Sequence, residues 1–193
     1  MGSVDNSKAS QALTSSTVAF TVCFAVWSIF SIIGVGIKQQ LGLDDTEFGL
    51  LVGTPILSGS LIRLALGVWT DTYGGRVVFV TVMLASAVAT FLLSYATTYG
   101  WMLVAALGVG IAGGSFAVGI AYVSRWYPKE KQGTALGIFG MGNVGSAVTK
   151  LLAPMIMVAY GWTVVAQIWA AALVVMALVF WFTTSDDPVL RAR

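Results

Sequence analysis

Two basic residues, Arg63 and Lys150, lie within long apolar stretches of the chain, and no Asp or Glu occurs at a comparable depth to pair with either. An unpaired cation at the centre of a membrane costs about 2.5–3.5 kcal/mol on insertion scales, so such residues usually line a watery cavity and meet a counter-ion. We interpret the missing counter-ion as the ligand, a small anion. Arg suits a planar oxyanion because its rigid fork donates two parallel hydrogen bonds.

Arg63 has small neighbours at helical spacing. Gly59 and Gly67 stand four residues before and after it, a pattern that indicates a face on which neighbouring helices approach closely. The alternative to anion binding is that the guanidinium of Arg63 donates to backbone carbonyls between helices or extends toward the membrane interface.

The region around Lys150 is rich in glycine and carries a polar stripe. Gly133 and Gly137 form a pair of small residues that indicates close helix packing. Asn143, Ser146 and Lys150 recur at spacings of three and four, so they lie on one face of a helix. We interpret Lys150 as a coupling residue or an accessory anion-binding residue. The alternative is that its ammonium group extends to the nearer membrane interface.

The composition predicts an integral membrane protein, because 58% of the residues are hydrophobic, 9% are charged and the mean hydropathy is +0.88. Cys23 is the single cysteine and the chain has no His, so we expect no metal site and no cofactor. The net charge of +2 is too small to indicate nucleic-acid binding. No nucleophile, base and orienting partner are grouped in the sequence, so we expect no enzymatic activity.

Long apolar windows predict membrane-spanning helices and therefore an all-α fold, an integral membrane bundle of six helices over residues 17–182. Residues 1–16 are polar and lack the pattern of a signal peptide, so we expect a cytoplasmic tail there. Residues 183–193 are expected to form a second cytoplasmic tail or the start of a linker. The six spans are expected at residues 17–37, 47–68, 77–97, 101–124, 132–156 and 162–182.

The basic residues outside the spans predict the orientation of the bundle. Seven of them fall on one side, whereas Lys38 alone falls on the other, beside three acidic residues. By the positive-inside rule, both termini are cytoplasmic and the protein lies in the lipid bilayer of the cytoplasmic (inner) membrane. The seven residues are Lys8, Arg76, Arg125, Lys129, Lys131, Arg191 and Arg193.

The loop between the second and third spans contains Gly67, Asp71, Gly74 and Arg76. Its glycines permit tight turns, and Asp71 can cap the following helix or pair with a cation, for which Arg125 at the end of the fourth span is the candidate. This pattern resembles the signature loop between the second and third helices of the major facilitator superfamily. The resemblance implies a cytoplasmic gate, and the alternative is a turn that only tethers two helices.

Further motifs resemble the nitrate/nitrite porters within that superfamily. The run GMGNVG at 140–145 is similar to their nitrate signature, and it is accompanied by GGSF at 113–116 and RWYPKEKQG at 125–133. The resemblance covers about residues 17–182 and implies the N-terminal six-helix half of such a porter.

The same resemblance implies roles for individual residues. Arg63 would hold the anion, Asn143 would face it, and Phe116 would form one aromatic wall. Trp27 or Phe30 would form another wall, with packing in the core as the alternative for both. The residues expected to contact or border the substrate are Arg63, Asn143, Phe116, Lys150, Gly142 and Gly145.

The expected function is transport of nitrate and/or nitrite by alternating access. Because the superfamily's carriers contain two six-helix halves, this chain is expected to act as a homodimer or with a second six-helix half. Proton coupling as symport and nitrate/nitrite exchange are both left open. Two other classes also stay open, namely a non-transporting membrane assembly or sensor protein, and a passive anion channel lined by Arg63, Asn143 and Lys150.

Overall fold

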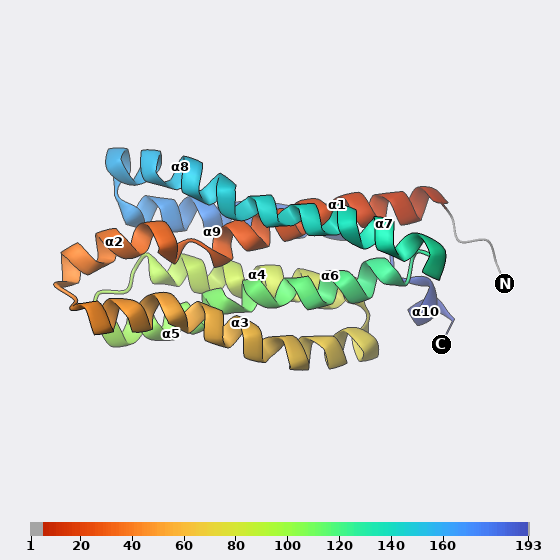
Figure 1. Ribbon diagram of the computed structural model, residues 1–193, viewed down its shortest axis with the longest axis horizontal. Coiled ribbons are helices and arrows are strands. Elements are labelled where there is room, and N and C mark those ends of the chain that lie inside the picture. The colour runs from red at the N-terminus through yellow and green to blue at the C-terminus, as the bar shows by residue number, and fades with distance from the viewer. Residues whose placement is uncertain (1–5, 193) are drawn as a thin grey trace.

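The computed structural model describes residues 6–192, and the prediction of an all-helical membrane bundle is confirmed for this part of the chain (Figure 1). Six helical segments are long and apolar enough to cross a membrane. The first described helix begins at the same end of the bundle at which the last one lies (Figure 1). The six segments are Asn6–Leu41, Asp45–Tyr73, Gly75–Leu93, Tyr99–Ser124, Lys129–Tyr160 and Trp162–Thr183.

Three of these spans are interrupted near their middle. A short turn after Trp27 interrupts the first span, and 3-10 turns interrupt the fourth and the fifth. Such turns inside a helix often mark hinges, because they exchange the regular backbone bonds for tighter ones. In chain order the elements are α1 (Asn6–Trp27), α2 (Phe30–Leu41), α3 (Asp45–Tyr73), α4 (Gly75–Leu93), α5 (Tyr99–Gly110), η1 (Ile111–Gly114), α6 (Ser115–Ser124), α7 (Lys129–Gly140), η2 (Met141–Asn143), α8 (Val144–Tyr160), α9 (Trp162–Thr183) and α10 (Pro188–Arg191).

The turns between spans are short and depend on glycine and on helix caps. Gly42, Gly74 and Gly161 have φ values of 65°, 93° and 92°, a region that favours glycine. At the start of α3, the side chain of Asp44 accepts from the backbone of Glu47, while the Glu47 side chain accepts from the backbone of Asp44. This capping box satisfies donors that the first turn of a helix leaves free.

Most helix boundaries differ from the sequence-based expectation by a few residues. The second helix extends to Tyr73 instead of residue 68, so Gly67 and Asp71 lie in α3 and not in the predicted loop. The first helix begins at Asn6, inside the segment 1–16 that we expected to be a polar tail, and residues 1–5 lie outside the described part. It extends that far because Ala9, Ala12 and Leu13 are buried against the rest of the bundle. The third helix ends at Leu93, four residues earlier than expected, because the chain turns there before the next helix begins.

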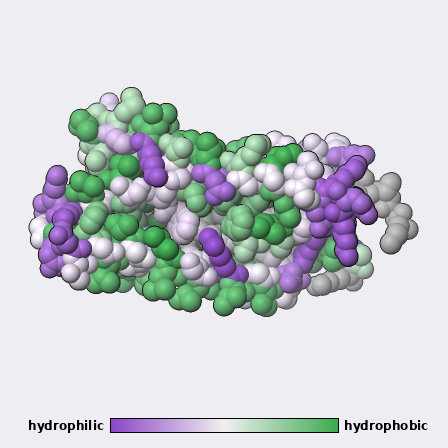
Figure 2. Space-filling model, in the orientation of Figure 1, coloured by the Kyte–Doolittle hydropathy of each residue, from purple (hydrophilic) through white to green (hydrophobic). Residues whose placement is uncertain are grey.

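The six spans are unequally covered by the rest of the chain. In their most apolar window, the second and fifth spans are 22% buried, against 44–50% in the other four. Gly133 and Gly137 of α7 have open space where a Cβ would stand, so the close packing predicted from their spacing does not occur within the described chain. Figure 2 shows hydrophilic residues gathered at both ends of the molecule, with isolated ones over its largely apolar middle. The faces of α3, α7 and α8 are therefore available to lipid or to another protein.

Candidate functional site

Arg63 lies between two aromatic rings at the level of the η1 turn. Its Cζ atom is 5.7 Å from the ring centroid of Trp27 and 5.8 Å from that of Phe116. Its Nε atom donates to the carbonyl oxygen of Gly113 at 3.3 Å, as in the backbone-bonded alternative considered above. Within the described chain, the two Nη atoms have no hydrogen-bond partner and Arg63 forms no ion pair. The planar, donor-rich end of the side chain is thus not used by the described chain.

Glycines bring Trp27 and Arg63 to the same place. The Nε1 atom of Trp27 donates to the carbonyl oxygen of Pro55 on α3 at 3.0 Å. A Cβ at Gly113 would lie 2.6 Å from the indole, and a Cβ at Gly59 would lie 2.7 Å from a backbone oxygen of α5. Any larger residue at either position would push the helices apart, so these two glycines permit the close approach of α3, η1 and the indole.

Phe116 belongs to an aromatic cluster that the sequence reasoning did not identify. The rings of Phe20 and Phe116 are 5.6 Å apart, and Phe20 stacks on Phe139 at 4.8 Å. On α1, Phe24 lies 5.5 Å from Phe20 and 5.2 Å from Trp27, so the rings form a continuous wall. The spacing of Phe20, Phe24 and Trp27 by four and three residues is the available signal, because it places all three on one helix face.

The residues of the predicted nitrate signature separate into two groups. Asn143 is exposed, and its side-chain amide donates to the carbonyl oxygen of Gly140 at 2.7 Å. Gly142 and Gly145 are buried against α1, where a Cβ on either would collide with it. In this arrangement the two glycines let the fifth span cross the first closely, and only Asn143 is open to a solute.

Lys150 lies in a groove of about 270 Å³ between the junction of α1 and α2, α3 and α8. The structure therefore brings Lys150 together with both candidate wall residues, Trp27 and Phe30. Arg63 does not line this groove, so the two cations occupy separate surroundings that share Trp27. The groove is lined by Phe24, Trp27, Ser28, Phe30, Ser31, Val52, Ile56, Ser146 and Lys150.

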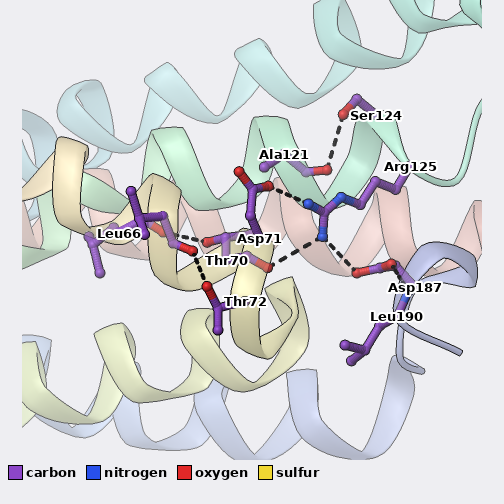
Figure 3. A network of polar contacts seen from close by, with 10 residues as sticks. Leu66, Thr70, Asp71, Thr72, Ala121, Ser124, Arg125, Asp187 and Leu190 are labelled. Carbon is purple, nitrogen blue, oxygen red and sulfur yellow. Dashed lines mark hydrogen bonds and ion pairs between the residues drawn. The ribbon is translucent and has the colours of Figure 1, made fainter. Parts of the chain in front are cut away.

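At the opposite end of the bundle, Arg125 connects three segments of the chain (Figure 3). The predicted ion pair with Asp71 is present, and the guanidinium also donates to the carbonyl oxygen of Thr70 at 3.3 Å. A third partner is Asp187, which is fully buried and accepts from Nη1 of Arg125 at 3.3 Å. Sequence reasoning missed Asp187, although an Asp directly before Pro188 is a recognisable start of a helix.

The remaining residues of the predicted gate have different surroundings. Arg76 stacks on the ring of Trp181, with Cζ 3.9 Å from the centroid, and donates to the carbonyl oxygen of the same residue. Gly74 forms the turn between α3 and α4, against the side chain of Leu190. Gly67 has nothing within 4 Å of where its Cβ would stand, so the close packing expected at this position is not made.

The arrangement has the features of a membrane carrier and none of a metal centre. Among the described residues, no three His, Cys, Asp or Glu side chains are placed to hold a metal ion. A six-helix bundle with a cation in the middle of an apolar span, aromatic walls and interrupted spans matches the architecture of one half of a secondary transporter. A sequence profile of the Major Facilitator Superfamily matches residues 16–193. The chain belongs to this superfamily of transporters, so the expectation of a membrane protein that is not an enzyme is confirmed.

The relatives of the chain include proteins named for nitrate transport. The probable nitrate/nitrite antiporter NarK1 of Thermus thermophilus is 42% identical in an alignment of 181 residues, which covers 88% of this chain and 41% of that protein. The probable nitrate transporter NarT of Staphylococcus carnosus is 32% identical over 179 residues, which are 93% of this chain and 46% of that protein. The chain thus spans about half the length of the curated relatives it matches.

A solved structure shows the same fold. The bacterial homolog of the human lysosomal transporter Spinster, in an inward-facing and occupied conformation, superposes with a TM-score of 0.81 at 21% identity. The match covers 95% of this chain and 46% of the other. The predicted resemblance to the superfamily is therefore confirmed by the sequence profile, and the solved structure shows that the fold is shared.

Proposed function

We propose that this chain forms one six-helix half of a carrier that moves nitrate and/or nitrite across the membrane by alternating access. The observation that carries the proposal is Arg63, which lies in the middle of an apolar span between Trp27 and Phe116 and whose two Nη atoms have no partner within the described chain. A cation in this position needs a counter-ion, and no carboxylate in the described chain supplies one.

The chemistry of the site favours a flat, singly charged oxyanion. Nitrate and nitrite are planar and can accept two parallel hydrogen bonds from one guanidinium. Two aromatic faces suit an ion that gives up its hydration more easily than phosphate does, and phosphate would require more than one cation. The names of NarK1 and NarT support the same choice of substrate.

The second half of the carrier is proposed to cover the second and fifth spans. These spans are the least buried, and the open glycines of α7 leave room for a neighbouring helix. Either a second copy of this chain, related by a two-fold axis along the membrane normal, or a different six-helix half would close the cavity over Arg63. We place both termini in the cytoplasm and the carrier in the inner membrane, in agreement with the positive-inside rule.

Alternating access needs parts that bend and parts that lock. The interruptions after Trp27, at η1 and at η2 are proposed as the places where the spans bend around the bound anion. The cluster of Arg125 with Asp71 is proposed as the cytoplasmic gate, because an ion pair between helix ends can break and re-form as the halves rock. Coupling by proton symport or by anion exchange is compatible with this arrangement.

The experiment is uptake of labelled nitrate into proteoliposomes that contain the chain, alone and together with a second six-helix half. We expect saturable uptake that is lost in Arg63→Gln and retained in Arg191→Gln, a matched change of an exposed arginine on α10. Uptake that rises with concentration without saturation would favour the passive channel. Equal uptake by the parent and Arg63→Gln would contradict the proposed site.

A further inference from the structure

We propose that the groove around Lys150 is a second anion-binding station, through which nitrate or a similar monovalent oxyanion passes before it reaches Arg63. The inference rests on the proposed function, because it assigns the same class of anion to another place on its path. It adds a site with its own cation, hydroxyl donor and aromatic walls, separate from the surroundings of Arg63.

The first support is the charge of the groove. Lys150 forms no hydrogen bond and no ion pair with any residue in the described part of the chain, and no Asp or Glu lines the groove. Lys38, the other lysine in this half of the bundle, is different. Its Nζ donates to Asp45 at 2.6 Å and lies 5.1 Å from the ring of Phe48. Lys150 is thus a cation whose charge the described chain does not compensate.

The second support is the supply of donors and space. Ser146 precedes Lys150 by one helical turn on the same face of α8, and its hydroxyl has no partner in the described chain. The hydroxyls of Ser28 and Ser31 already donate to backbone carbonyls, so Ser146 is the free hydroxyl donor. A volume of about 270 Å³ holds a small oxyanion with several waters, since one water takes about 30 Å³ in the liquid.

The third support is the position of the groove along the bundle. Ile56, which lines the groove, precedes Arg63 by seven residues on α3, and Lys150 lies on α8, which runs antiparallel to α3. Seven helical residues extend about 10 Å, or nearly two turns, so the part of the groove at Ile56 lies about 10 Å along α3 from the level of Arg63. The direction is toward the α8 to α9 turn, the outer side in the proposed orientation.

Trp27 connects the two stations. It lines the groove of Lys150, and its ring lies 5.7 Å from Cζ of Arg63. An anion that moves from Lys150 to Arg63 therefore passes along the indole of Trp27, and its cationic partner changes from the ammonium of Lys150 to the guanidinium of Arg63. Two successive weak sites let an ion enter without being trapped, because each site needs to compensate only part of the lost hydration.

The direct test measures whether nitrate protects the Lys150 amine. The chain in proteoliposomes is methylated with formaldehyde and a borane reductant in nitrate or in gluconate at equal ionic strength, and each lysine is quantified by mass spectrometry. We expect nitrate to slow methylation of Lys150 saturably while leaving Lys38 unchanged. The protection should persist in Arg63→Gln, because the groove has its own cation.

Three outcomes would overturn the proposal. In the first, Lys150 is methylated at the same rate with and without nitrate. In the second, nitrate slows methylation of Lys150 and Lys38 equally. In the third, the water-soluble reagent never methylates Lys150. Protection without uptake would count against the transport function alone. Normal uptake without protection would count against the second station alone.

A transport measurement separates binding at the groove from a structural role of Lys150. Lys150→Met should raise the KM for nitrate about tenfold with little change in maximal rate, as expected for loss of one charge-assisted hydrogen bond. Lys150→Arg should restore the KM, since it keeps the charge, and Lys38→Met should leave it unchanged. An unchanged KM in Lys150→Met would contradict the proposal even if that variant folds normally.

Discussion

Arg125 donates a hydrogen bond from Nη1 to Oδ2 of Asp187 at 3.3 Å, although 62 residues separate the two along the chain (Figure 3). Asp187 is fully buried, and its other carboxylate oxygen accepts from the backbone N–H of Leu190 at 2.8 Å to cap α10. The segment after the last span is therefore not a simple tail. It folds back over the ends of α3 and α6 and shares Arg125 with the proposed gate residue Asp71.

We predict that Asp187→Asn destabilises the protein by about 3 kcal/mol. The change removes a buried charge partner of Arg125 and weakens the cap of α10, and breaking buried ion pairs typically costs this much. The unfolding temperature in detergent and the rate of proteolysis after residue 184 measure the effect. Asp186→Asn is the matched control, because the carboxylate of Asp186 makes no such contact in the described chain. Equal stability of the two variants would refute the prediction.

Gly145→Ala should destabilise the bundle by about 1–3 kcal/mol, the usual cost of an extra methyl group in a packed interface. The new Cβ would collide with the backbone of α1, which cannot move aside as a flexible side chain can. The unfolding temperature of the chain measures the loss. Gly133→Ala provides the comparison, because open space surrounds it and Ala favours helix over Gly by up to about 1 kcal/mol.

Gly137→Leu should leave the isolated chain folded and impair its association with the second half. Nothing lies within 4 Å of the Cβ position at Gly137, so the chain itself has room for the larger side chain. A neighbouring helix that packs on this face would collide with the new side chain. Cross-linking yield and unfolding temperature, measured together, separate the two effects, with Gly100→Leu as the control at another open glycine. Unchanged cross-linking in Gly137→Leu would place the second half elsewhere.

Trp27→Phe should lower stability by about 1–2 kcal/mol and alter nitrate affinity. The substitution removes the hydrogen bond from Nε1 to Pro55 and leaves a gap beside Gly113, although an aromatic face toward Arg63 remains. The comparison is Trp101→Phe, because Trp101 is an exposed tryptophan that neither lines the groove of Lys150 nor stacks on Arg63. If the two variants had the same KM for nitrate and the same unfolding temperature, Trp27 would have no special role in the site.

Much of the fold followed from the sequence because membrane insertion depends on local composition. Six long apolar stretches separated by short polar ones predict six helices, since an isolated backbone in lipid must satisfy its own hydrogen bonds. The pair of Asp71 and Arg125 was also predictable, because both residues stand at helix ends that return to one side. The start of α1 at Asn6 was not, because a polar helix that packs on its neighbours has no hydropathy signal.

The candidate site was predictable in its chemistry and unpredictable in its geometry. A cation at membrane depth, such as Arg63 or Lys150, is visible in the sequence because its charge opposes the local composition. The sequence could not show that Gly142 and Gly145 face α1 while Asn143 is exposed, because all three lie in one short run and differ only in the direction they face. The same limit applied to Phe20 and Phe139, whose stacking joins distant segments of the chain.

The sequence by itself therefore determined the membrane setting, the number of helices, the superfamily and the two cations within apolar spans, since each depends on residue type and local spacing. The tertiary structure decided which residues share a surface. It placed Trp27 between Arg63 and the groove of Lys150, and it brought Asp187 to Arg125. Such relationships depend on how helices rotate and cross, and those rotations are set by packing over the whole bundle.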